Sequence, residues 1–264
     1  MAEPGLYTRT QILVKSAGVE RLRQAHVLLA GVGGVGGFAA EALVRAGIGR
    51  LTLVDHDVVA MTDLNRQLAS THETMGQKKV EVLGCRLASI HPECQLELVD
   101  RFLTPAIIPE VLDAARPDWL IDAIDSLNSK VGLLIAARER GIAVASSMGA
   151  GGRLDPTALV VGDLMDSTIC PLAREVRRRL HRRGQGRGIR AVWSTEPAAE
   201  PLPPEPTPTG RPRSVNGTIS YLPALFGMTL AGIVIQSLLS PLQSGEERGE
   251  TVEEPGMPHS DGVR

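Results

Sequence analysis

Hydrophobic positions fall into two alternating kinds of segment through about residue 150. Short apolar runs without interruption predict buried parallel strands, and each is followed by a stretch whose apolar residues recur at helical spacing. The runs predicted as strands are 25–31, 50–55, 95–103, 118–125 and 142–149, and the predicted helices are 37–49, 78–90, 110–116 and 128–141. This alternation predicts an α/β fold with a doubly wound, mostly parallel, Rossmann-like sheet.

The pattern changes after Gly149. Residues 171–184 read as a basic helix, and the proline-rich stretch 197–214 reads as a mobile loop. Residues 219–239 carry no charge, but Pro223 and two glycines interrupt them, which favours a buried or dimer-interface helix over membrane contact. We expect a core at 1–155, an extension with antiparallel strands and a closing helix at 156–245, and a disordered tail at 246–264.

A glycine turn follows the first predicted strand, in the form Gly31-x-Gly33-x-x-Gly36, with Gly34 inside it. Such a turn brings backbone N–H groups and a helix N-terminus to a phosphate. Asp55 ends the second predicted strand at the distance expected of a carboxylate that holds ribose hydroxyls. NAD, FAD and ATP fit these features equally well.

The residues after Asp55 favour ATP. Asn65 and Arg66 follow it by ten and eleven residues, and Lys79 opens a helix. An arginine and a lysine directed at the ligand suit a triphosphate that is cleaved, because they neutralise the charge that develops on the phosphates. Hydride transfer needs an uncharged binding pocket for nicotinamide instead. Asp125 ends a predicted strand, where a carboxylate lies over the ligand crevice and suits Mg²⁺. Each residue alone also fits a solvated side chain or, for Asp125, a helix cap; their joint order predicts an ATP site.

Charge and cysteine content narrow the class of protein. The net charge is −2, but eight arginines and one glutamate lie between Arg174 and Arg190, a local asymmetry typical of a surface that binds polyanions. The three cysteines include no CxxC pair, which argues against a disulfide framework and a four-cysteine zinc site. No secretory signal opens the chain, so we expect a cytoplasmic protein.

The ordered set of glycine turn, Asp55, Asn65-Arg66, Lys79 and Asp125 resembles the ThiF/MoeB superfamily of adenylyltransferases, which are related to ubiquitin-activating enzymes. The resemblance implies a homodimer that uses ATP to adenylate a carboxylate. It implies catalytic roles for Arg66, Lys79 and Asp125, with Asp125 holding Mg²⁺. It also implies a nucleotide site formed by Gly31, Gly33, Gly34, Gly36, Asp55, Asp57, Asn65, Arg66, Lys79, Asp125, Asn128 and, from the partner subunit's N-terminal element, Arg9.

Residues 148–180, the stretch RAVWSTEP and the final apolar segment are similar to the tRNA threonylcarbamoyladenosine dehydratase branch of that superfamily. This resemblance implies that the acceptor is the threonyl carboxylate of a modified adenosine in tRNA. The arginines then become candidate tRNA contacts, with a solvated helix face as the plain alternative. The candidates are Arg174, Arg177, Arg178, Arg179, Arg182 and Arg183.

Several alternatives stay open at this point. The chain could instead adenylate the C-terminal Gly-Gly of a sulfur-carrier or ubiquitin-like protein, act as an NAD-dependent dehydrogenase, or serve as a non-catalytic scaffold. A sulfur-transfer partner protein is a further candidate partner. Cys170, at the start of the basic helix, could carry a reactive thiolate or be incidental, whereas Cys85 and Cys94 are expected to pack in the interior.

Overall fold

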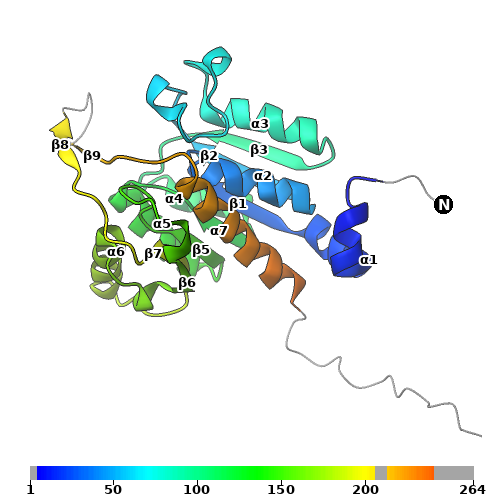
Figure 1. Cartoon of the computed structure of the whole chain (residues 1–264). Helices are drawn as coiled ribbons and strands as arrows, with labels where there is room; N and C mark the ends of the chain where they lie inside the picture. Colours follow the sequence, from blue (N-terminus) through cyan, green and yellow to red (C-terminus); the bar gives the residue numbers. More distant parts are fainter. Residues whose placement is uncertain (1–4, 206–212, 241–264) are drawn as a thin grey trace, which may run out of the picture.

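A seven-stranded sheet forms the centre of the molecule in the computed structural model, which describes residues 5–205 and 213–240 (Figure 1). The strand order is β3-β2-β1-β4-β5-β7-β6, and every pair is parallel except β6 with β7. The strands of this sheet are β1 (His26–Ala30), β2 (Arg50–Asp55), β3 (Gln95–Asp100), β4 (Trp119–Asp122), β5 (Ala143–Ser147), β6 (Leu159–Asp163) and β7 (Arg190–Ser194). The strand order reverses beside β1, so the carboxyl ends of β1 and β4 flank a crevice of the kind where α/β sheets bind ligands.

Helices cover both faces of the sheet, and each face has its own apolar core. The first core gathers side chains from α1, α2, α3 and α7, and the second gathers side chains from α4, α5 and α6. Their bounds are α1 (Thr8–Gln24), α2 (Gly36–Ala46), α3 (Lys79–Ile90), α4 (Ile108–Ala115), α5 (Leu127–Glu139), α6 (Pro171–His181) and α7 (Leu222–Leu239). Short 3-10 helices occupy Met61–Asp63, His72–Thr74, Pro156–Ala158 and Leu164–Asp166. The observed layers confirm the predicted doubly wound α/β fold.

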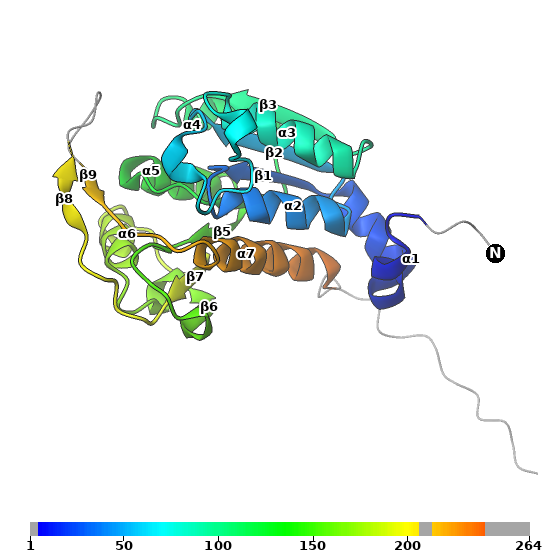
Figure 2. The ribbon, with the colours of Figure 1, turned by 45° about the horizontal axis from the view of Figure 1, so that its top comes forward.

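The closing helix α7 lies directly beside α2, and both views show the two helices side by side (Figures 1 and 2). Gly227 permits this approach, because a Cβ at that position would lie 2.1 Å from the carbonyl oxygen of Val35. The helix is long and apolar enough to cross a membrane, yet Phe226, Leu230 and Val234 on it are fully buried in the first core. Packing against the sheet therefore accounts for the apolar residues on this side of α7.

Several segments differ from the sequence prediction, among them the strand predicted over 95–103, which ends at Asp100. The stretch 197–214 is predicted as a loop, but it contains β8 (Leu202–Glu205) and the start of β9 (Arg213–Val215), which pair as an antiparallel two-stranded sheet at one end of the molecule (Figure 2). Strand β4 was predicted to reach Asp125 and ends at Asp122, because the carboxylate of Asp122 accepts the N–H of Ile124 and turns the chain. The predicted tail, 246–264, lies outside the described residues.

Candidate active site

A cavity of about 650 Å³ opens at the carboxyl ends of β1, β2, β4 and β5. This is a typical size for a site that holds a small molecule or cofactor. Its lining contains most of the residues that the sequence singles out: Gly31, Gly33, Gly34, Asp55, Asp57, Arg66, Lys79 and Asp125. Tertiary structure thus brings together side chains that span nearly a hundred residues of sequence.

The glycine turn between β1 and α2 requires glycine at two positions. Gly31 has a φ of +88°, and a Cβ there would lie 2.8 Å from the carbonyl oxygen of Ala123. A Cβ on Gly36 would lie 1.8 Å from the carbonyl oxygen of Gly31. The turn is therefore closed tightly enough to direct its backbone and the first turn of α2 toward the cavity, which suits a phosphate group.

Asp55 lies at the end of β2, in the position expected of a ribose ligand. Its Oδ2 accepts the N–H of Val32 at 2.7 Å, and its Oδ1 accepts the N–H groups of His56 and Asp57. These bonds hold the carboxylate between the glycine turn and the segment that follows β2. Because each carboxylate oxygen has two lone pairs, Oδ2 retains one that can accept a ribose hydroxyl, whereas Oδ1 already accepts two N–H groups.

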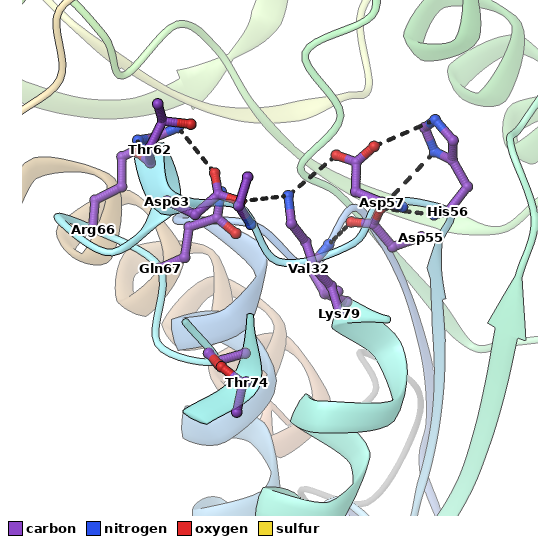
Figure 3. A network of polar contacts seen from close by, with 12 residues as sticks. Val32, Asp55, His56, Asp57, Thr62, Asp63, Arg66, Gln67, Thr74 and Lys79 are labelled. Carbon is purple, nitrogen blue, oxygen red and sulfur yellow. Dashed lines mark hydrogen bonds and ion pairs between the residues drawn. The ribbon is translucent and has the colours of Figure 1, made fainter. Parts of the chain in front are cut away.

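Lys79 points between two carboxylates at the start of α3 (Figure 3). Its Nζ lies 3.2 Å from Oδ2 of Asp57 and 3.3 Å from Oδ2 of Asp63, and its side chain is 7% exposed. The backbone of Lys79 also donates to the carbonyl oxygen of Asp57. The ammonium group is therefore fixed at the cavity wall before any nucleotide binds.

Asp63 is a residue that the sequence analysis did not select. It is buried, and its Oδ1 accepts Nε2 of Gln67 at 2.6 Å and lies 3.6 Å from a guanidinium nitrogen of Arg66. Asp63 therefore lies between Arg66 and Lys79 and orients both (Figure 3). The available signal was its position between two selected residues, Asp57 and Arg66, in a segment already assigned to the site.

Arg66 lines the cavity, whereas the side chain of Asn65 binds the segment that precedes α7. Nη1 of Arg66 donates to the carbonyl oxygen of Thr62 and to Oδ1 of Asn65. Nδ2 of Asn65 donates to the carbonyl oxygen of Thr218 at 2.9 Å. Asn65 thus connects the arginine to the segment that leads into α7, although it is not among the residues that line the cavity.

Asp122 ends β4 and Asp125 follows it by three residues, but the two carboxylates occupy different environments. Asp125 lines the cavity, in the turn before α5, where its carboxylate is a suitable ligand for Mg²⁺. Asp122 is fully buried, and its Oδ2 lies 2.6 Å from Nζ of Lys130 and 2.5 Å from Oγ of Ser146. Nζ of Lys130 also donates to the carbonyl oxygen of Ser147 at 2.9 Å. This buried network joins α5 to the ends of β4 and β5 beneath the cavity.

Three other predicted nucleotide ligands do not line the cavity of the single chain. Gly36 begins α2 behind the turn, and Oδ1 of Asn128 accepts a hydrogen bond from Nη1 of Arg179 at 2.5 Å. Arg9 is exposed near the start of α1. This helix lies at the end of the molecule opposite β8 and β9 (Figure 2). A role for Arg9 therefore depends on a second subunit.

Another part of the cavity lining is formed by segments that follow β5 and β7, by the start of α6 with the residue before it, and by the segment before α7. We call this the acceptor wall, and its residues are Met148, Gly149, Ala150, Gly151, Arg153, Cys170, Pro171, Leu172, Ala198, Asn216 and Thr218. Arg153 is the single charged residue among them and is 4% exposed. Cys170 is 2% exposed and precedes the first turn of α6, immediately after Ile169, whose φ is +61°.

The basic helix α6 begins at the acceptor wall and runs away from the cavity. Two of its arginines are half-buried: Arg177 donates to Ser167, and Arg179 donates to Glu175 and Asn128. Hydrogen bonds from Arg178 and Arg179 lower the pKa of the Glu175 carboxyl to about 2. The other three candidate arginines are exposed, and their side chains bind no other described residue: Arg174 in α6, and Arg182 and Arg183 just beyond its end.

The cysteines differ from one another in exposure. Cys94 is buried as predicted; its Sγ donates to the carbonyl oxygen of Ile48, and burial raises the pKa of its thiol to about 11. The prediction that Cys85 packs in the interior is wrong, because this residue lies on the solvent side of α3. Neither thiol lines the cavity, which leaves Cys170 as the one cysteine beside it.

Comparison with known proteins agrees with this geometry. Residues 7–254 match the ThiF family. A tRNA threonylcarbamoyladenosine dehydratase of Bacillus subtilis is 32% identical over 244 residues, which cover 90% of this chain and 96% of that protein. The Escherichia coli protein of the same name is 39% identical over 184 residues, 67% of this chain and 68% of its own length. A crystal structure of the E. coli dehydratase in complex with ATP superimposes with a TM-score of 0.79 at 32% identity, covering 88% of this chain and 93% of that one.

Proposed function

The chain belongs to the ThiF family, and from this premise we propose that it catalyses the ATP-dependent cyclising dehydration of threonylcarbamoyladenosine in tRNA. The products are cyclic threonylcarbamoyladenosine, AMP and pyrophosphate. One observation carries the proposal: a chain that matches dehydratases over most of its length gathers Asp55, Arg66, Lys79 and Asp125 around one cavity. A tRNA substrate agrees with the expected cytoplasmic location.

The chemistry requires activation of a carboxylate. An oxygen of the threonyl carboxylate attacks the α-phosphorus of ATP, the bond from this phosphorus to the bridging oxygen breaks, and pyrophosphate leaves. An atom of the carbamoyl group then attacks the activated carbonyl, AMP departs with the bonding pair, and a proton passes to solvent. The nucleophile of the second step is already attached to the substrate, so little acid–base assistance is needed.

The chain's own residues supply binding and charge compensation. Arg66 and Lys79 lie where they can neutralise the negative charge that develops on the leaving pyrophosphate. The closed glycine turn fits a phosphate, and Asp55 fits the ribose. Asp125 fits Mg²⁺, which when bound would neutralise further phosphate charge.

Helix α6 supports the tRNA part of the proposal. It starts at the acceptor wall, so an RNA that inserts a base into the cavity would lie along its exposed side. Arg174, Arg178, Arg182 and Arg183 are exposed and suit phosphate contacts. Arg177 and Arg179 are half-buried in bonds to the protein, so we assign them to the support of the helix rather than to direct contact.

We also propose a homodimer in which Arg9 reaches the partner subunit's nucleotide. The exposed apolar side chains of α1 support this, since Ile12 is 60% exposed and Leu13 is 82% exposed. Contact with another subunit would remove this apolar surface from water. A sulfur-transfer partner remains a prediction that none of these contacts addresses.

A turnover assay tests the function. The purified chain is incubated with ATP, Mg²⁺ and tRNA that carries threonylcarbamoyladenosine, and release of AMP and pyrophosphate is measured beside mass analysis of the nucleosides. We expect release only with the modified tRNA and a product nucleoside that has lost one water. Unmodified tRNA and a small protein ending in Gly-Gly are the controls, and turnover that depends on the protein would favour the carrier-protein alternative instead.

A further inference from the structure

Arg153 is a buried cation whose described partners are all neutral. Its Nε donates to the carbonyl oxygen of Glu196 at 2.9 Å, and its Nη1 donates to the carbonyl oxygens of Gly149 at 2.7 Å and Gly151 at 3.0 Å. Its Nη2 is shielded from water and has no hydrogen-bond partner among the described residues. A guanidinium that has lost its hydration without gaining an anion is held at a cost in free energy.

Glu196, whose carbonyl oxygen accepts the hydrogen bond from Nε of Arg153, has its carboxylate bound to other groups. The carboxylate of Glu196 accepts the backbone N–H groups of Leu154 and Asp155, at 2.9 Å and 2.7 Å from Oε2. The carbonyl oxygen of Glu196 therefore binds Arg153, while the carboxylate of Glu196 binds the backbone of Leu154 and Asp155. This division leaves the positive charge of Arg153 uncompensated by the groups that bind it.

Arg153 lies at the cavity and not behind it. Its Nη1 and the Sγ of Cys170 each lie 3.5 Å from the position that a Cβ on Gly149 would take. Both atoms therefore approach the backbone of Gly149, which has no side chain to separate them from it. Every other described residue of the acceptor wall is uncharged. The cations Arg66 and Lys79, proposed to bind the triphosphate, come from different segments of the lining, after β2 and at the start of α3.

From this arrangement we infer that Arg153 is a specificity-determining residue that selects an acceptor bearing a carboxylate. This role rests on the proposed function: the threonyl carboxylate binds at the acceptor wall, where its negative charge compensates that of the guanidinium group. Carbonyl groups at three points fix the guanidinium in advance, so little side-chain entropy is lost when the anion binds. A neutral acceptor of the same shape would leave the charge uncompensated.

A binding experiment distinguishes recognition of the acceptor carboxylate by Arg153 from a purely structural role, in which Arg153 only stabilises the loop whose carbonyl groups it binds. We compare two synthetic RNA stem-loops, one carrying threonylcarbamoyladenosine and one in which a carboxamide replaces its carboxylate. Each is titrated against the full chain in the presence of an ATP analogue whose α,β-bridge is methylene, which prevents turnover. The protein is the wild type, Arg153→Gln, Arg153→Lys, or the matched control Arg140→Gln at the far end of α5, where Arg140 pairs with Asp113.

We expect the wild type and Arg140→Gln to bind the carboxylate RNA about tenfold or more tightly than the amide RNA, as is typical of a hydrogen bond to a charged group. Arg153→Gln should bind both RNAs with similar affinity, and Arg153→Lys should keep part of the preference. The inference is overturned if the wild type shows no preference or no binding, or if Arg153→Gln retains the preference. Preferential binding by a wild type that releases no AMP from modified tRNA would instead refute the proposed function and leave this inference standing.

Discussion

The buried pair of Lys130 and Asp122 offers the sharpest test of how the cavity floor is held. We consider Lys130→Met, which keeps an unbranched side chain of similar length and removes the charge. The substitution leaves the carboxylate of Asp122 in a fully buried position with two remaining donors, Oγ of Ser146 and the N–H of Ile124. It also removes the hydrogen bond to the carbonyl oxygen of Ser147.

The expected loss of stability follows from this environment. Both side chains are fully buried and their charged atoms lie 2.6 Å apart, so removal of one partner strands a charge away from water. Such a change costs about 3–5 kcal/mol in the free energy of unfolding. For a chain of this size that corresponds to a fall of roughly 6–20 °C in Tm.

Urea and thermal unfolding, followed by circular dichroism, measure the effect. Arg23→Ala is the control, since it breaks a pair with Glu93 in which both side chains are largely exposed, and about 0–1 kcal/mol is expected. The double variant Asp122→Asn/Lys130→Met should recover part of the loss, because neither charge then remains buried.

Two results would refute this reasoning. The first is a free energy of unfolding for Lys130→Met within about 1 kcal/mol of the wild type, the loss typical of an exposed pair. Burial of the pair would then contribute little to the effect of the substitution. If the double variant is less stable than Lys130→Met, the stranded charge is not the cause of the loss, and the hydrogen bond to Ser147 or the packing of the stem must explain it.

Three further predictions concern nucleotide, RNA and pH. Asp125→Asn should fold normally and lose Mg²⁺-dependent AMP release, and unchanged turnover would remove Asp125 from the site. Changing the exposed, unpaired arginines in and just after α6 to glutamate should weaken tRNA binding and flatten its dependence on salt; the residues are Arg174, Arg182 and Arg183. An unchanged salt slope would mark them as a solvated face. Burial lowers the pKa of His26 from its ordinary 6.5. Just below pH 6.5 the imidazole is therefore protonated in the unfolded chain and neutral in the folded chain. Stability should therefore fall as pH drops below about 6.5, and His26→Gln should flatten that fall in unfolding measured between about pH 5 and pH 7; an equally steep fall in the variant would contradict the assignment.

Much of the nucleotide half of the cavity is predictable from local sequence. The glycine turn, Asp55 and Lys79 each stand at the end of a strand or the start of a helix, and such ends meet at one edge of a parallel sheet. Periodicity alone therefore places them near one another. Asp63 escaped prediction because a buried carboxylate that orients other side chains has no spacing rule of its own.

The acceptor wall is less predictable. It combines segments after β5 and β7 with segments before α6 and α7, and hydrogen bonds across long stretches of sequence join them, such as Gly152 N–H to the carbonyl oxygen of Gly217 at 2.7 Å. The charge of Arg153 gains its meaning from burial among carbonyl groups, which a sequence does not reveal. Its neighbour Leu154 shows the same dependence, since its carbonyl oxygen accepts the hydroxyl of Tyr221.

The sequence by itself determined the order of strands and helices and the closed glycine turn, because these depend on residues close together in the chain. The tertiary structure alone decided which of two nearby carboxylates faces the cavity: Asp122 is neutralised by Lys130 beneath it, while Asp125 lies three residues beyond at the lining. It also decided which arginines of α6 remain free, since the rotation of a helix against its neighbours sets which side chains find partners. Burial and pairing depend on distance in space, and side chains of one type thereby acquire different roles.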